Sequence, residues 1–401
     1  MSSEEVKMFN LTIAKEYMNS NNIDAWILYD FRGSNSILHS ILDCVPAVSR
    51  RYFLIIDKVK KPVLICNMLD KPQFDFCKYD KCFYTRLEDL KGYLKKYIAN
   101  YKRIITEYSP CATLPTMSIL DVGTYELLKS QNSNLKILTS ADCYQLSCGS
   151  WENASLKRHF DACIQVEEIK NIAFDFIKSN VLSEKMVTEY DVQKIILDEF
   201  EKRGLITEDV PVVAVNRNSS DPHYEPSSSL FSQIKLNDWV LIDLWAKYPE
   251  DTAVFADITW VGYMGEKVPL QYTRVFKIVK EMRDSVVKLL KDSWKQGIVL
   301  EGWQADEQAR EIARKYQVEN YFIHRTGHSI APGNILHSLT VNLDNYETKD
   351  TRKILPRLGF SVESGIYLPE FGVRSEINIY MDEKEGPKVT TNKQEEIITF
   401  N

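Results

Sequence analysis

Acidic side chains stand inside apolar runs of this sequence, where a charge is costly. Trp239–Tyr263 reads as two strands around a turn at Lys247–Thr252, and the strands carry Asp243 and Asp257. If this hairpin is symmetric about Glu250, the two aspartates lie directly opposite each other. Opposed like charges are destabilising, and burying them costs several kcal/mol each unless a cation lies between them. The pattern therefore predicts a metal ion.

A second hairpin repeats this arrangement near the end of the chain. Phe360–Leu368 and Val373–Tyr380 read as its strands, with the turn at Pro369–Glu370. This symmetry places Glu363 opposite Glu376. One buried acid in a strand is more often a satisfied structural residue, but the same arrangement in two hairpins favours a functional site.

Between the hairpins, the segment Tyr321–Ile330 carries two histidines, His324 and His328. Four carboxylates and one imidazole form an oxygen-rich donor set, which suits Mn, Co, Fe or Zn, and the carboxylate count suits two ions that share ligands. A pair of such ions lowers the pKa of a bridging water and clamps a carbonyl oxygen. The predicted chemistry is metal-assisted hydrolysis of an amide or related bond.

These hairpins need a scaffold, and 401 residues are enough for two domains. The composition turns small and polar around Leu146–Ser155, so we expect domains at 1–150 and 151–401. In the first domain, helical and strand patterns alternate, which favours an α/β layer structure. The expected helices are Glu4–Asn21, Leu87–Ala99 and Asp121–Ser130, and the expected strands are Ala25–Tyr29, Arg51–Ile56, Val63–Cys66, Arg103–Glu107 and Lys136–Leu138.

The second domain is expected to carry longer helices beside the hairpins. Thr188, with Asp191 three residues later, resembles a capping box at the start of one of them. A strand at Pro211–Val215 should precede the first hairpin, and a short edge strand should follow Asp382. The expected helices are Leu156–Asn180, Thr188–Lys202, Thr273–Lys295 and Ala305–Tyr316.

Composition narrows the functional classes. An apolar content of 44% and a charged content of 26% are typical of a globular protein, and a net charge of −6 argues against nucleic-acid binding. We find neither a signal-peptide pattern nor a membrane-spanning run. All eight cysteines fall within the first 163 residues without CxxC spacing, which favours free thiols in a reducing compartment. The prediction is a cytoplasmic protein with no membrane partner.

The order Asp, Asp, GH, ExG, RxE resembles the pita-bread metallopeptidases: methionine aminopeptidase, aminopeptidase P, prolidase and the metal-free creatinase. An α/β domain before the catalytic one is similar to the aminopeptidase P, prolidase and creatinase branch. The resemblance implies an α+β fold class, with an N-terminal α/β creatinase/prolidase-type domain followed by a C-terminal pita-bread domain. It also implies a homodimer that acts on peptides with proline at the second position.

Carried over by position, the resemblance implies roles for individual residues. Five would bind metal: Asp243, Asp257, His328, Glu363 and Glu376. Glu363 would also be the general base, and His223 and His337 would contact the substrate or its tetrahedral intermediate. Three more would lie near the substrate: His324, Tyr367 and Arg374. The alternative roles are a surface histidine for His223 and an ion-pair partner of the glutamates for Arg374.

The sequence also departs from the family pattern. The two aspartates are farther apart than usual, and the loop from His328 to His337 is two residues longer. Val341 replaces the arginine with which prolidases tend to bind a dipeptide carboxylate, which speaks against a strict dipeptidase.

The function that follows is a dinuclear metal-dependent peptidase for Xaa-Pro bonds, similar to aminopeptidase P or prolidase. Manganese is the first choice of metal, with cobalt, zinc or iron as alternatives. Two other functions stay open: hydrolysis of a small non-peptide amide, and a non-catalytic binding protein on this scaffold. The last is disfavoured because all five ligand positions are filled.

Overall fold

The computed structural model describes residues 9–42 and 44–400. The chain divides into two compact units, Met1–Gly149 and Ser150–Asn401. Within the described residues, no helix combines the length and the apolar character that a membrane span requires.

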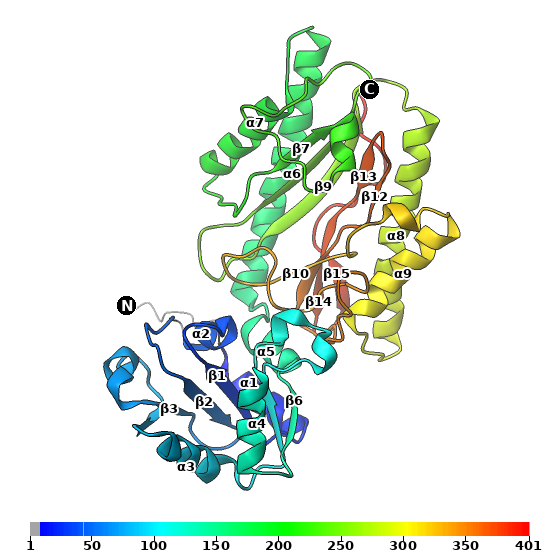
Figure 1. Cartoon of the computed structure of the whole chain (residues 1–401). Helices are drawn as coiled ribbons and strands as arrows, with labels where there is room; N and C mark the ends of the chain where they lie inside the picture. The colour runs from blue at the N-terminus through cyan, green and yellow to red at the C-terminus, as the bar shows by residue number, and fades with distance from the viewer. Residues whose placement is uncertain (1–8, 43, 401) are drawn as a thin grey trace. The chain divides into compact units, whose positions relative to one another are not determined.

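The N-terminal unit is built on a six-stranded mixed sheet with the strand order β4-β3-β2-β1-β5-β6. Its strands are β1 Ala25–Asp30, β2 Tyr52–Asp57, β3 Val63–Asn67, β4 Asp80–Tyr84, β5 Arg103–Thr106 and β6 Lys136–Thr139. Its helices are α1 Leu11–Ser20, α2 Ser36–Leu42, α3 Leu87–Ile98, α4 Val122–Gln131 and α5 Ala141–Cys148 (Figure 1). On α3, Leu90, Leu94 and Ile98 recur every four residues and form one apolar stripe that packs into the core of the sheet.

Most elements expected in this unit are present. The predicted strand pair is confirmed, because β2 pairs with β3 in antiparallel fashion. The helix expected from Glu4 begins only at Leu11, after Asn10, whose side chain accepts a hydrogen bond from the Ile13 N–H. Residues 4–8 of that prediction lie outside the described residues. Helices α2 and α5 were not predicted, because they are only 7 and 8 residues long.

The C-terminal unit places three small sheets between two pairs of helices. Its helices are α6 Asn153–Leu182, α7 Glu189–Lys202, α8 Leu270–Lys295 and α9 Gly302–Lys315. Its strands are β7 Val212–Val215, β8 Trp239–Ala246, β9 Ala256–Tyr263, β10 Ser329–Ile330, β11 Gly359–Val362, β12 Gly365–Tyr367, β13 Gly372–Arg374, β14 Ile377–Asp382 and β15 Gly386–Val389. The sheet orders are β7-β8-β9, β10-β11-β14-β15 and β12-β13. Helix α6 packs on β8 and β9, and α8 packs on β13 and β15 (Figure 1).

Local sequence signals explain where these helices begin and which face they bury. The Thr188 hydroxyl accepts a hydrogen bond from the Asp191 N–H, and the Asp191 carboxylate accepts one from the Thr188 N–H. The predicted capping box of α7 is therefore confirmed. On α8, Val279, Met282 and Val286 are fully buried in the main core at helical spacing.

The first hairpin pairs β8 with β9 in a register that differs from the predicted one. Asp243 lies opposite Thr259, and Asp257 lies opposite Trp245. The prediction of directly opposed aspartates is therefore wrong. Because the offset is two residues, both carboxylates still point to the same face of the sheet, as diagonal neighbours.

The connection between these strands explains the difference. The ladder is centred on Asp251, because the turn closes through a hydrogen bond from the Ala253 N–H to the Glu250 carbonyl. Lys247 leaves the hairpin and pairs instead with Ile206, N–H to carbonyl in both directions. The symmetry point therefore moves by one residue, and each pairing partner moves by two.

The second hairpin has the predicted register. β11 pairs with β14 and β12 pairs with β13 in one continuous alignment. This alignment places Glu363 and Glu376 at facing positions in the short break between the two ladders. The Leu368 N–H donates to the Phe371 carbonyl over 3.0 Å, with Pro369–Glu370 at the tip of the turn. The predicted opposition of the two glutamates is confirmed.

Candidate metal centre

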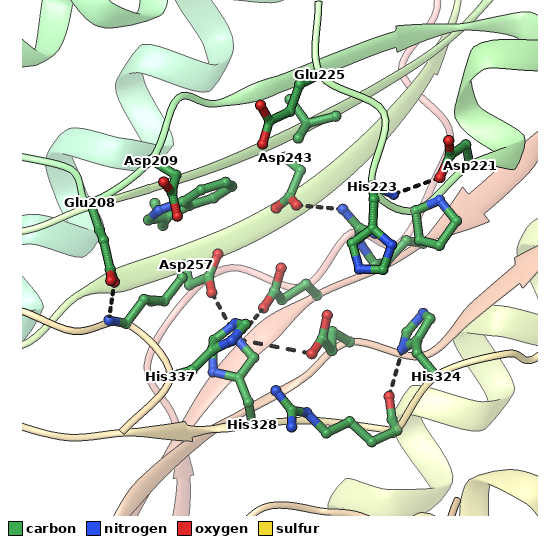
Figure 2. A pocket seen from close by; sticks show the side chains of 18 of the residues that line it. Glu208, Asp209, Asp221, His223, Glu225, Asp243, Asp257, His324, His328 and His337 are labelled. Atoms are coloured by element: carbon green, nitrogen blue, oxygen red, sulfur yellow. Dashed lines mark hydrogen bonds and ion pairs between the residues drawn. The ribbon is translucent and has the colours of Figure 1, made fainter. Parts of the chain in front are cut away.

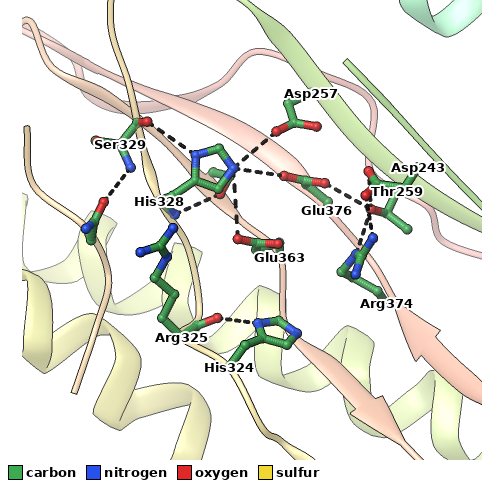
Figure 3. Close-up of polar contacts among 12 residues, drawn as sticks. Asp243, Asp257, Thr259, His324, Arg325, His328, Ser329, Glu363, Arg374 and Glu376 are labelled. Carbon is green, nitrogen blue, oxygen red and sulfur yellow. Dashed lines mark hydrogen bonds and ion pairs between the residues drawn. The ribbon is translucent and has the colours of Figure 1, made fainter. Parts of the chain in front are cut away.

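Three residues expected to bind metal converge from three different segments. Asp257 lies on β9, His328 immediately precedes β10, and Glu376 immediately precedes β14. One ligand atom of each lies within 4.8 Å of the other two. His328 Nε2 is 3.2 Å from Asp257 Oδ2 and 3.9 Å from Glu376 Oε1 (Figure 3). All three side chains are buried, so the cluster forms the floor of the site.

Glu363 stands at the edge of this cluster. Its Oε1 is 3.9 Å from His328 Nε2, and its side chain is 17% exposed, whereas those of His328 and Glu376 are at most 3% exposed. Burial raises the pKa of Glu363, and the positive charges of His328 and Arg374 oppose that rise. A partly exposed carboxyl group with a raised pKa is suited to accept and donate a proton.

Asp243, the fifth expected ligand, is held by hydrogen bonds. The Arg374 guanidinium donates to its Oδ2, and the Thr259 hydroxyl lies 2.9 Å from its Oδ1. The same hydroxyl lies 2.9 Å from Glu376 Oε2, and its single proton can serve only one of the two carboxylates at a time. Burial raises the pKa of Asp243, while the charge of Arg374 lowers it. Arg374 thus compensates the charge of Asp243 within the protein itself.

The donor set fits a divalent cation. Within the described part of the chain, the buried Oε1 of Glu376 has no hydrogen-bond partner. Burial raises the pKa of Glu376 well above its usual range, and the charges of Asp257 and Glu363 raise it further. A buried oxygen in this condition is costly unless a cation or a proton satisfies it. Carboxylate oxygens around one imidazole suit Mn, Co, Fe or Zn.

The cluster lies in a pocket of about 560 Å³ that is also lined by His223, His324 and His337 (Figure 2). The ring of His337 lies 4.1 Å from that of His328, centroid to centroid. The longer loop therefore still brings His337 to the site. Desolvation by the pocket walls, with the charges of His328 and Arg325, lowers the pKa of His337. His223 is an exposed residue of the loop before β8.

The remaining expected pocket residues form a hydrogen-bonded chain. Arg374 donates to the Tyr367 hydroxyl over 3.0 Å, and that hydroxyl is 2.8 Å from His324 Nε2. His324 Nδ1 is 2.6 Å from the Arg325 carbonyl, which can only accept. Nδ1 therefore carries the proton, and Nε2 accepts from Tyr367. Burial and the charge of Arg374 lower the pKa of His324 to about 3, so this ring stays neutral.

Sequence reasoning missed three residues that line the pocket, Glu208, Trp245 and Arg325, and one that contacts the candidate ligands, Thr259. Thr259 stands two residues after Asp257 on the same strand face, a spacing that could have revealed it. Arg325 lies between the two histidines of its segment and also lines the pocket. Trp245 has a buried Nε1 without a partner in the described structure. Glu208 accepts a hydrogen bond from the Leu336 N–H over 2.7 Å, next to His337.

Carboxylates from two antiparallel hairpins and an imidazole from the segment between them converge here, and this donor set is typical of metal-dependent hydrolases. The chain belongs to metallopeptidase family M24, whose family model matches residues 158–383. The predicted fold class, an α/β domain followed by a pita-bread α+β domain, is confirmed.

Among similar curated proteins is the "Putative Xaa-Pro aminopeptidase" of Mycoplasma pneumoniae, which is 26% identical over 46% of this chain and 48% of its own length. The chain thus spans about half the length of this relative. The "Xaa-Pro dipeptidase" of Lactobacillus helveticus is 25% identical over 63% of this chain and 68% of its own length.

Solved structures share the fold over nearly the whole chain. Dipeptidase PepE from Mycobacterium ulcerans has a TM-score of 0.65 at 17% identity and covers 97% of this chain and 96% of its own. The X-prolyl aminopeptidase from Caenorhabditis elegans has a TM-score of 0.61 at 13% identity, with 96% of this chain and 62% of its own covered. The latter is described as a cytosolic enzyme with a di-nuclear active site.

Proposed function

We propose that this chain is a dinuclear metal-dependent peptidase that hydrolyses Xaa-Pro bonds, in the manner of an aminopeptidase P or a prolidase. The observation that carries the proposal is the convergence of Asp257, His328 and Glu376, with Glu363 beside them, in the floor of an open pocket. Membership of family M24 and the names of the relatives support it.

Five residues would hold the ions: Asp243, Asp257, His328, Glu363 and Glu376. Arg374 would orient Asp243 through its hydrogen bond to that carboxylate, and the Thr259 hydroxyl would bridge Asp243 and Glu376. When bound, two divalent ions would supply an activated water and polarise the carbonyl of the scissile bond.

The protein's own groups would handle the protons and the developing charge. Glu363 would accept a proton from the attacking water and donate it to the leaving proline nitrogen. His223 and His337, which line the same pocket, would hold the oxyanion of the tetrahedral intermediate. The neutral His324, kept in place by Tyr367, would form part of the wall against which the substrate packs.

Two assays test the proposal. Xaa-Pro dipeptides, Xaa-Pro-Yaa peptides and a small non-peptide amide such as acetamide are offered to the protein loaded with Mn, Co, Zn or Fe. Turnover of the peptides only is the expected result, and turnover of the non-peptide amide only would overturn it. Equilibrium dialysis should show close to two Mn ions per chain, and less than one would exclude a dinuclear centre.

The length of the preferred peptide is a separate question. Val341, where the resemblance implies an arginine in prolidases, is fully buried in the core and so cannot contact a substrate.

We also propose manganese as the native metal, a homodimer and a cytoplasmic location. Metal analysis of protein prepared without added metal would test for manganese, and light scattering on the purified protein would test for the homodimer.

A further inference from the structure

The charges that line the pocket are arranged unevenly. Beyond the metal cluster, five exposed acidic residues line it: Glu208, Asp209, Asp221, Glu225 and Glu347. In Figure 2, the first four lie along one side of the pocket, whereas His324, His328 and His337 lie along the other. Most of the pocket wall therefore repels a carboxylate and attracts a cation.

Two arginines line the same pocket, and their situations differ. Arg374 is buried, and its guanidinium donates to Asp243, Thr259 and Tyr367. Its N–H donors are therefore already hydrogen-bonded to residues of the protein. Arg325 lies on the histidine side, between His324 and His328 in sequence (Figure 3).

The guanidinium N–H donors of Arg325 have no hydrogen-bond acceptor among the described residues. Within the described residues, its guanidinium makes no hydrogen bond, and its one ion pair, to Glu347, spans 3.9 Å. The Arg325 side chain is 20% exposed and that of Glu347 is 50% exposed, so this pair is a loose surface contact of small energy. The charge of Arg325 nevertheless reaches the centre, since it helps to lower the pKa of His337 and opposes the rise in the pKa of Glu363.

We propose that Arg325 binds the C-terminal carboxylate of a short peptide substrate. A guanidinium presents paired N–H donors that match the two oxygens of a carboxylate. The acidic residues across the pocket disfavour a carboxylate on that side, so Arg325 also fixes the direction in which the peptide lies. This inference rests on the proposed function and names its substrate class: short peptides with a free carboxylate close to the scissile bond.

The test compares Ala-Pro with Ala-Pro amide, which share the scissile bond and differ in the carboxylate charge. With the Mn²⁺-loaded full chain, we expect kcat/KM to be at least about tenfold higher for Ala-Pro, the effect of one charge-assisted contact. Arg325→Gln should remove at least tenfold from Ala-Pro turnover and much less from amide turnover. Arg325→Lys keeps the charge and loses the paired N–H donors, so its kcat/KM for Ala-Pro should lie between those of the wild type and Arg325→Gln.

A matched control is Arg314→Gln. Arg314 is an exposed arginine of α9 that pairs with Glu307 and Glu319 and does not line this pocket. This variant should keep the wild-type preference. Thermal melting and bound Mn²⁺ verify that each variant is folded and loaded.

Three results would overturn the inference: equal wild-type turnover of acid and amide, a preference that survives in Arg325→Gln, or an equal loss on both substrates. The last would make Arg325 a support of the site and not a substrate contact. Absence of wild-type turnover of both peptides with every metal would instead refute the proposed peptidase function.

Discussion

Loading the centre with Mn²⁺ should release protons, because the metal-free site holds them. Burial raises the pKa of Asp243, Glu363 and Glu376. Burial opposes protonation of His328, but its hydrogen bond to Asp257 and the charge of Glu363 outweigh that effect and raise its pKa. Metal ligands must be deprotonated to bind, so each proton held here competes with the ion.

The magnitude follows from linkage. Each proton displaced makes the apparent affinity rise tenfold per pH unit, or about 1.4 kcal/mol. Glu376, whose pKa is raised well above its usual range, should account for one of the protons released. Over the pH range in which Glu376 holds its proton in the metal-free protein, the Mn²⁺ affinity should therefore increase with pH by about tenfold, or about 1.4 kcal/mol, per pH unit.

Isothermal titration calorimetry of Mn²⁺ into metal-free protein, in two buffers of different ionisation heat, counts the protons at each pH. Glu376→Gln should release about one proton fewer. A carboxyl group whose pKa is higher in the folded than in the unfolded protein binds its proton more strongly in the folded state. The free energy of unfolding therefore falls as the pH rises from the unfolded-state pKa to the folded-state pKa. The metal-free protein should thus lose thermal stability in that direction, and the loaded protein should lose less. A pH-independent affinity with no proton release would refute the reasoning.

Three further predictions concern single residues. Glu363→Gln should lower kcat at least about hundredfold, because a general base is lost, and near-wild-type activity in a steady-state assay would exclude that role. His337→Ala should lower kcat more than tenfold, and a smaller loss would place this ring outside the reaction. Burial lowers the pKa of His159, which contacts Phe255 and Thr390, to about 4. Its neutral form therefore contributes stability that is present above pH 6.5 and is lost between pH 6.5 and 4, up to about 3 kcal/mol. In chemical unfolding, His159→Gln should show a correspondingly smaller loss over that interval, and an unchanged loss would contradict the assignment.

The two hairpins show how much of the site could be predicted from sequence. Alternation along a strand places a carboxylate on a face whatever the register, so the shared face of Asp243 and Asp257 could be predicted. Their pairing partners depend on the turn. A short turn at Pro369–Glu370 leaves one register for the second hairpin. The first hairpin has a nine-residue connection, Lys247–Phe255, whose route is set by contacts with Ile206 that the local sequence does not reveal.

The residues missed by sequence reasoning are those whose roles arise only from tertiary convergence. Thr259 is an ordinary strand threonine until Asp243 and Glu376 arrive on either side of its hydroxyl. In the sequence, Arg325 cannot be told from an ordinary surface arginine, and only its position in the pocket distinguishes it. The spacing of residues within one segment predicts which face of a helix or strand they share and where that element ends. Contacts between segments far apart in the chain can be identified only from the three-dimensional structure.

The two aspartates of the first hairpin meet the same electrostatic problem in different ways. Asp243 is compensated inside the protein, since Arg374 donates to one of its oxygens and the Thr259 hydroxyl, shared with Glu376, lies beside the other. Asp257 faces His328 and Glu376, and the Glu376 oxygen nearest that ring has no hydrogen-bond partner in the described structure, only the 3.9 Å contact with His328 Nε2. Arg374 therefore supplies a counter-charge for Asp243 only, whereas the Glu376 oxygen beside Asp257 depends on a cation or a proton. Two like charges on one face of this hairpin thus favour a metal more strongly beside Asp257 than beside Asp243.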